Sequence, residues 1–207
     1  MQHFAAVGFS FGILLGVFVQ LNLVPNQADE IKDVVARMKR SQQHLGPEVP
    51  AVKNPAKRYA GQLMGRWATI LGAGMLVPVA RRIKGQINEL AKSVANFDAL
   101  PEADHNSIEG LSHHAEVLLP HSMHLFLRTD FDHPRNRVRV DLTKQIYMVE
   151  GTNTDFLDAR GDTRLAQMWS MVHFGDYMAY YLAIGYGVDP TPIPRLAAFK
   201  SALKEKN

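Results

Sequence analysis

The sequence predicts an α/β protein in which a parallel β-sheet is covered by helices on both faces, a three-layer αβα arrangement. Short apolar runs of strand length alternate along the chain with longer stretches of helical apolar spacing, which is the pattern of right-handed βαβ units. The composition is ordinary for a globular protein, because 46% of the 207 residues are hydrophobic and 21% are charged. An intrinsically disordered chain is therefore not expected.

The chain opens with an uncharged apolar run, residues 4–24. The run is long enough to cross a bilayer, but it lacks the charged start and the small-residue cleavage site of a secretory signal. Gly8, Gly12 and Gly16 recur every four residues, a spacing that permits close helix packing in a membrane or in a protein core. We expect a buried core helix, with a membrane span or a signal segment as the alternatives.

An amphipathic helix is predicted at residues 26–45, where the apolar residues follow helical spacing. Asn26 is a candidate cap for this helix, and Gly46 ends it. A proline-rich linker follows. The next helix is predicted to have Asn54 as its cap and Pro55 at its first position.

Strands and helices alternate through the rest of the chain. Strands are predicted at residues 68–74, 95–100, 122–128 and 146–149. Helices are predicted at residues 76–92, 106–112, 134–145, 163–186 and 194–204. In parallel sheets of this kind, ligands bind at the carboxyl ends of the strands.

Charge and composition exclude several classes of function. The formal net charge is only +3 and no long basic run is present, so a nucleic-acid-binding surface is not expected. The chain has no cysteine, which excludes disulfides, thiolate nucleophiles and cysteine-based zinc sites and is compatible with the cytoplasm. His121 and His124 lie three positions apart, and at the spacing of a strand such positions point to opposite faces, so we predict no metal site.

Three segments carry residues capable of acid–base chemistry. They hold Glu89 on the helix after the first strand, His105 in an acidic loop after the second strand, and Lys200 near the end of the chain. Taken alone, each residue has a simple structural explanation. Glu89 and Lys200 are the kind of charge that usually faces solvent on a helix, and His105 is the kind of residue found exposed or beside a helix cap.

Together, several segments identify a family. The motifs RRIKGQINELAK, LPEADHNSIEG, LRTDFDHPRNRVRVDLTKQI and WSMVHFGDYMAYYLAIGYGVDPTPI occur in this order. They closely resemble the C-terminal sugar isomerase (SIS) domain of bifunctional phosphoglucose/phosphomannose isomerases. The resemblance runs from about Asn54 to Lys200 and so covers most of the chain.

The resemblance implies a reaction and the residues that perform it. These enzymes interconvert glucose 6-phosphate or mannose 6-phosphate with fructose 6-phosphate through a cis-enediol, without a cofactor or a metal. The Glu of the QINE motif, here Glu89, moves the proton between C1 and C2. The His of the DHN motif, here His105, assists ring opening from the neighbouring subunit, which implies a homodimer with its active site at the subunit interface. Lys200 is the best match for a lysine that also serves ring opening.

The chemistry agrees with these roles. One carboxylate can take a proton from C2 and return it to C1, and burial can raise its pKa towards the range that such a base needs. An imidazole, whose unperturbed pKa is about 6.5, is suited to moving a proton at the ring oxygen.

The resemblance also implies that part of the enzyme is missing. The family has two SIS domains, and the Ser/Thr-rich loops that hold the sugar phosphate lie in the first, whereas Gly72-Ala73-Gly74 here lacks serine and threonine. Residues 1–50 resemble the last helix of that first domain and its connection, and 51–207 resemble the second domain. We expect weak activity from this chain alone, unless a separate chain supplies the first domain. A non-catalytic sugar-phosphate-binding or regulatory SIS module is the alternative function.

Overall fold

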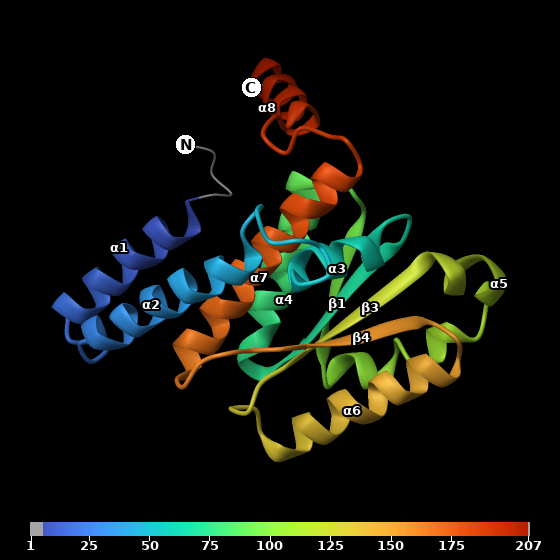
Figure 1. Ribbon diagram of the computed structural model, residues 1–207, viewed down its shortest axis with the longest axis horizontal. Coiled ribbons are helices and arrows are strands. Elements are labelled where there is room, and N and C mark those ends of the chain that lie inside the picture. The colour runs from blue at the N-terminus through green and yellow to red at the C-terminus, as the bar shows by residue number, and fades with distance from the viewer. Residues whose placement is uncertain (1–5, 207) are drawn as a thin grey trace.

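The computed structural model describes residues 6–206, and its four strands form one parallel sheet in the order β2-β1-β3-β4 (Figure 1). The strands are β1 (Trp67–Ala73), β2 (Ala95–Leu100), β3 (Ser122–Arg128) and β4 (Asn153–Asp158). Ile70 of β1 is in register with Phe97 of β2 and Leu125 of β3. The predicted parallel α/β architecture is confirmed.

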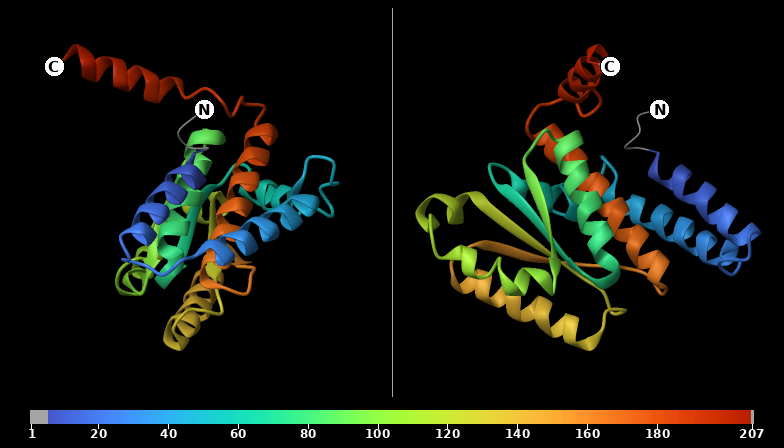
Figure 2. Two further views of the ribbon diagram at one scale, coloured as in Figure 1. Left: turned by 90° about the vertical axis from the view of Figure 1, so that its left-hand side faces the viewer. Right: turned by 180° about the vertical axis from the view of Figure 1, so that it is seen from behind.

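Helices cover both faces of the sheet (Figures 1 and 2). On one face lie α4 (Val77–Leu90) and α7 (Arg164–Gly185), together with α2 (Ala28–Leu45) and α3 (Pro55–Leu63). On the other face lies α6 (Pro134–Val149). Neighbouring residues of a strand point to opposite faces, so Ile70 joins the larger apolar cluster with α4 and α7, while Leu71 joins a smaller one with α6.

The predicted fourth strand was wrong. Residues 146–149 are the last turn of α6, and the strand lies later, at β4. The buried residues Val140, Thr143 and Tyr147 are three and four positions apart, so the helical period continues through the short apolar run that indicated a strand. β4 was missed because it lies at the edge of the sheet, where its mostly polar sequence is only partly covered.

The second and third helices agree better with the sequence. Helix α2 spans Ala28–Leu45 and ends at Gly46. Asn26 accepts a hydrogen bond from the Ala28 amide, although Gln27 occupies the cap position itself. Helix α3 spans Pro55–Leu63. As predicted, Asn54 caps it by accepting from the Lys57 amide, and the buried Asn54 side chain also donates to the Leu45 carbonyl, which joins α2 to α3.

The connection between β2 and β3 is a series of short turns and not the single helix predicted at residues 106–112. It contains η3 (Glu102–His105), η4 (Glu109–Leu111), α5 (Ala115–Leu118) and η5 (Leu119–His121). Of residues 106–112, only Ile108 and Leu111 pack against the cluster beneath α6, and Ser107, Gly110 and Ser112 favour a helix poorly. A longer helix here would therefore have little to bury against the sheet.

Among the described residues, two of the longer helices, the first and the last of the chain, have no buried residue. Helix α1 (Val7–Gln20) leaves Phe9 and Leu14 well exposed, so the prediction of a buried core helix was wrong for the described part of residues 4–24; residues 4 and 5 lie outside it. Its packing includes an edge contact between Phe11 and Trp169 of α7, which covers only one side of the helix. Within residues 6–206, no helix combines the length and apolarity needed to cross a bilayer.

The second such helix is α8 (Pro194–Glu205), which extends away from the rest of the molecule (Figure 2). Its predicted position in the sequence was correct to within one residue at the carboxyl end.

Candidate functional site

Glu89 lies in the last turn of α4, where it is half-buried. Helix α4 is held against the sheet by apolar residues on one side, among them Val79, Ile83 and Ile87. Glu89 lies off this buried side and lines a pocket of about 450 Å³. The pocket is formed by the end of α4, the turn that leads into β2 and the first turn of α8. It is lined by Asn88, Glu89, Lys92, Ser93, Val94, Ala95, Ile193, Pro194, Arg195 and Leu196.

Lys92 closes this pocket on one side. Its ammonium group donates to the backbone carbonyl of Glu89 at 2.6 Å and to that of Pro190 at 3.1 Å. Asn88 donates to the Ser93 carbonyl at 2.8 Å. These bonds hold the end of α4 to the segment that leads into α8, and they fix the backbone on which Glu89 stands. Lys92 was not among the residues predicted from the sequence.

A polar network lies on the same side of α4 as Glu89. Arg82, Gln86 and Glu89 are four and three positions apart, so they lie on one face of the helix. Gln86 donates to Asp176 of α7 at 2.5 Å, and Arg82 lies 3.5 Å from the same carboxylate. Burial raises the pKa of Asp176, against the opposing effects of the Arg82 charge and the Gln86 hydrogen bond. The QINE motif includes two residues of this face, Gln86 and Glu89. The partner of Gln86 on α7, Asp176, was not predicted from the sequence.

His105 is the last residue of η3 and its side chain is exposed. The turn is anchored by its neighbours. Ala103 is buried in the cluster beneath α6, and Asp104 accepts from the Thr143 hydroxyl at 2.7 Å and lies 3.4 Å from the guanidinium of Arg139. These contacts fix the backbone of the loop while leaving the imidazole free to meet a group outside it.

Glu89 and His105 lie at opposite ends of β2. Glu89 precedes the first residue of the strand, Ala95, and His105 follows the last, Leu100. Five steps along a strand cover about 17 Å. The two side chains are therefore not brought together within one chain.

Lys200 lies in the middle of α8 and is exposed. The helix begins at the Glu89 pocket, since Pro194 and Leu196 line it. A separation of four positions in a helix corresponds to a rise of about 6 Å. Lys200 is thus on the element that borders the Glu89 pocket, but beyond the part of that element that lines it.

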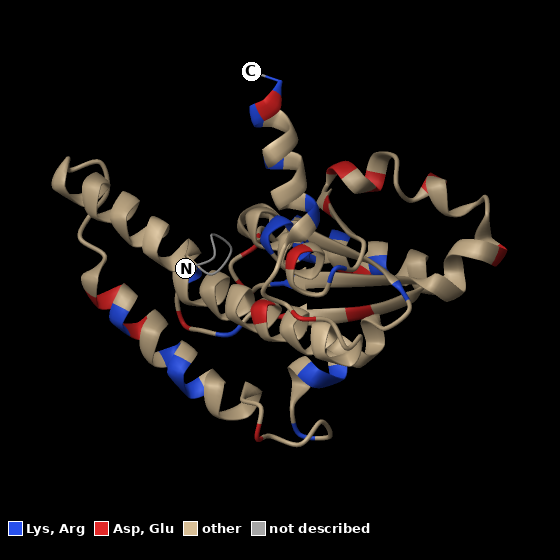
Figure 3. Ribbon diagram, turned by 90° about the horizontal axis from the view of Figure 1, so that it is seen from above, with Lys and Arg blue, Asp and Glu red and all other residues tan. Residues whose placement is uncertain are grey.

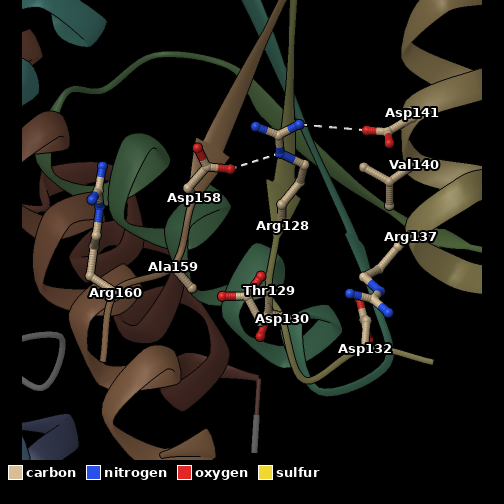
Figure 4. Close-up of a pocket in the computed structure, with 10 residues that line it drawn as sticks. All are labelled: Arg128, Thr129, Asp130, Asp132, Arg137, Val140, Asp141, Asp158, Ala159 and Arg160. Atoms are coloured by element: carbon tan, nitrogen blue, oxygen red, sulfur yellow. Dashed lines mark hydrogen bonds and ion pairs between the residues drawn. The ribbon is translucent and has the colours of Figure 1, made fainter. Parts of the chain in front are cut away.

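A second, polar pocket of about 450 Å³ lies at the carboxyl ends of β3 and β4 (Figure 4). Arg128 contacts both Asp158 and Asp141 there, at 2.7 and 3.5 Å. Asp132 is only 9% exposed, and burial raises its pKa in spite of the charges of Arg164 and Arg137. None of the three predicted residues lines this pocket.

Asp132 also limits what the turn after β1 can bind. A Cβ built on Gly74 would lie 2.4 Å from its carboxylate oxygen, and one on Gly72 would lie 2.7 Å from the Leu76 carbonyl. The turn therefore carries a carboxylate close to its backbone and has no hydroxyl side chain. This is a poor environment for a phosphate.

A third pocket, of about 590 Å³, lies between the amino ends of the strands and α5. Its floor includes Thr69, Asn96 and His124, and its walls include Leu111, Val117 and Leu118. Burial lowers the pKa of His124 to about 4, which a backbone hydrogen bond at Asn153 partly opposes. In the described part of the chain, no three histidine, aspartate or glutamate side chains are grouped as metal ligands.

Comparison with known proteins identifies the family of this chain. The family model described as the bacterial phospho-glucose isomerase C-terminal SIS domain matches residues 52–203. A bifunctional phosphoglucose/phosphomannose isomerase from Caldicellulosiruptor bescii is 37% identical over 99% of this chain and 60% of its own length. The corresponding protein from Aquifex aeolicus is 32% identical over 95% of this chain and 58% of its own length.

A solved structure supports the same relationship. The glucose-6-phosphate isomerase like protein from Thermus thermophilus matches with a TM-score of 0.65 and 26% identity, over 78% of this chain and 52% of that one. The chain thus spans about three fifths of the length of the two curated relatives. It belongs to the family of bacterial phosphoglucose isomerase C-terminal SIS domains.

Proposed function

We propose that this chain is the C-terminal half of an aldose–ketose isomerase that interconverts glucose 6-phosphate, and mannose 6-phosphate, with fructose 6-phosphate. One observation carries the proposal. Glu89, the carboxylate that the family motif assigns to proton transfer, is half-buried and lines a pocket at the end of α4. A carboxylate buried inside the core or fully open to water would not serve this chemistry.

In the proposed reaction Glu89 takes the proton from C2 of the open-chain aldose and returns it to C1 of the enediol. His105 and Lys200 act earlier, when the ring oxygen must gain a proton as the ring opens. General acid–base catalysis of this kind contributes about 10²–10⁴ in rate. The reaction as drawn uses only side chains of the protein and requires neither a cofactor nor a metal.

The proposal requires groups from outside this chain's own core. The turn after β1 has the Asp132 carboxylate over Gly74 where a phosphate loop would need hydroxyls and free amides. His105 lies about 17 Å from the Glu89 end of β2. We propose that a second copy of the chain supplies His105 in a homodimer, and that a first SIS domain, on this polypeptide or on a separate one, holds the phosphate. In this proposal residues 1–50 are the end and connection of that first domain.

We further propose a cytoplasmic enzyme whose small-molecule partner is a hexose 6-phosphate. The absence of cysteine is compatible with a reducing compartment. The net charge of +3 without a basic run favours a small anion over a nucleic acid.

The test measures interconversion of glucose 6-phosphate and fructose 6-phosphate. The chain is assayed alone and with the separately expressed first SIS domain of the C. bescii relative. We expect weak activity alone and a large gain with the added domain. Glu89→Gln, which keeps size and hydrogen bonding but removes the base, is expected to lower the rate by about 100-fold or more. Lys39→Glu on α2, far from the pocket, is the control.

Binding without turnover would contradict the proposal. In that case calorimetry shows that the complemented protein binds hexose 6-phosphate, but no turnover is detected. If Glu89→Gln also binds as the wild type does, the chain is the non-catalytic sugar-phosphate-binding or regulatory alternative.

A further inference from the structure

Helix α8 has a composition that does not suit an isolated helix in water. None of its residues is buried, and a helix of about 12 residues is marginal without packing. Leu196, Phe199 and Leu203 lie within about 60° of one another around the helix axis, at 100° per residue. All three are exposed. The helix therefore presents an apolar stripe that, among the described residues, borders the Glu89 pocket at Leu196 and is exposed at Phe199 and Leu203.

Basic residues border this stripe. Lys200 and Lys204 lie on one side of it, and Arg195 and Lys206 lie on the other. None of the four is in an ion pair within residues 6–206. Glu205 is the one acidic residue after Pro194. Helix α8, called the arm below, thus presents an apolar stripe with basic residues on both sides.

A segment of opposite charge lies earlier in the chain. Residues 93–127 contain five acidic residues and no lysine or arginine. Figure 3 shows the acidic positions spread along the loop that leads through α5, while the basic positions of α8 lie on the projecting helix. Glu102, Glu109 and Glu116 of this segment are exposed and, within the described residues, form no ion pair.

The same segment contains an apolar hollow of suitable size. This hollow, the α5 hollow, is the 590 Å³ pocket walled by Leu111, Val117, Leu118 and Trp67. Val117 and Trp67 of its lining are exposed. Glu109 and Glu116 stand next to lining residues in the sequence, and Arg66 is the one lysine or arginine of the lining. The hollow can receive an apolar stripe, and the segment that walls it carries acidic residues opposite in charge to the basic residues that border the stripe.

We propose that α8 packs in the α5 hollow of a second copy of this chain, and that the second copy returns its own α8 to the first. Within one chain the two do not meet, because α8 leaves the Glu89 pocket and projects from the body for about 17 Å (Figure 2). A reciprocal exchange satisfies both surfaces with a single two-fold axis.

The exchange also bears on the isomerase site. Helix α8 starts at the Glu89 pocket and carries Lys200, and residues 93–127 carry His105. Docking the arm on that segment of the second copy brings elements with all three predicted residues into one interface. This consequence rests on the proposed function, whereas the docking itself does not.

The test is a charge exchange between two variant chains, scored by sedimentation without any sugar phosphate. One chain carries Lys204→Glu with Lys206→Glu, and the other carries Glu109→Lys with Glu116→Lys. Each alone is expected to dimerise about tenfold or more weakly than the wild type, and their mixture is expected to form a heterodimer with the affinity restored. The control, Lys39→Glu with Arg40→Glu on α2, makes the same charge change as the first and is expected to dimerise normally. Circular dichroism verifies that every variant folds.

A cross-link tests the geometry. The chain has no cysteine, so single cysteines at Ala202 of one chain and Ser112 of another can form a disulfide only between chains. A cross-linked dimer supports the exchange. A monomeric wild-type protein, a dimer that ignores both charge reversals, or an intrachain disulfide in the double Ala202→Cys/Ser112→Cys chain overturns it. So does binding of α8 only to an added first SIS domain. Because no substrate is present, the docking can fail while Glu89-dependent isomerisation stands.

Discussion

Helices α4 and α8 each carry a residue that we propose for acid–base chemistry, Glu89 and Lys200, but the two helices differ in how the fold holds them. Six residues of α4 are buried against the sheet and α7. Lys92 joins the end of α4 to Pro190, in the segment that leads into α8. No residue of α8 is buried. The chain therefore positions Glu89 by itself and does not position Lys200. A site that depends on both is completed only when something covers α8.

The largest expected effect concerns whether the site is divided between chains. Glu89→Gln and His105→Gln are each expected to lower isomerase activity by about 100-fold or more in the complemented assay. Mixed in equal amounts and allowed to exchange subunits, the two variants are expected to regain about a quarter of the wild-type activity, because half of the dimers then hold one intact site of two. No recovery despite demonstrated subunit exchange would mean that both residues act from one chain, or that His105 does not act.

The second prediction compares the packing of the core with that of the arm. Met178 of α7 is fully buried, whereas Leu203 of α8 is 49% exposed. Met178→Ala is expected to lower the free energy of unfolding by about 2–5 kcal/mol. Leu203→Ala is expected to change it by less than about 0.5 kcal/mol when the protein is dilute enough to be monomeric. Urea unfolding of both variants measures this, and equal losses would mean that α8 is packed within its own chain.

The third prediction concerns pH and the buried end of the sheet. Burial lowers the pKa of His124 from 6.5 to about 4, so between these values the unfolded chain binds a proton that the folded chain does not. The contribution of His124 to the free energy of unfolding is therefore fully present above about pH 6.5. It is lost as the pH falls towards 4, by about 3 kcal/mol in all.

His124→Phe keeps a ring against Tyr147 and is expected to flatten the stability curve between pH 4 and 6.5. Chemical unfolding at a series of pH values measures the curve. The exposed His113, changed to Gln, is expected to leave the curve as in the wild type. An unchanged slope in His124→Phe would mean that His124 is protonated in the folded protein.

The smallest effect tests the close contact between α4 and α7. A Cβ on Gly175 would lie 2.5 Å from Ile83 Cγ1, whereas one on Gly85 would have no atom within 4 Å. Gly175→Ala is therefore expected to cost about 1–3 kcal/mol through overpacking. Gly85→Ala is expected to stabilise the chain by up to about 1 kcal/mol through helix propensity alone. Thermal unfolding distinguishes them, and a neutral Gly175→Ala would show that the two helices can separate without cost.

Sequence reasoning worked where a local pattern has one structural solution. The strands at residues 95–100 and 122–128 were predicted with the observed bounds, and Asn54 was identified as a cap from its position before Pro55. It failed where the pattern was ambiguous. The run at residues 146–149 is apolar enough for a strand, but its burial follows a helical period that only the packing of α6 reveals.

The amino-acid sequence by itself determined the order of strands and helices, the family, and the three residues predicted for the chemistry, because each depends on neighbours along the chain. The tertiary structure alone decided that Glu89 borders a pocket, that His105 lies at the other end of β2, and that no described residue of α1 or α8 is buried. These facts depend on which surfaces meet when strands about 4.8 Å apart form a sheet. No local pattern in the chain carries that information.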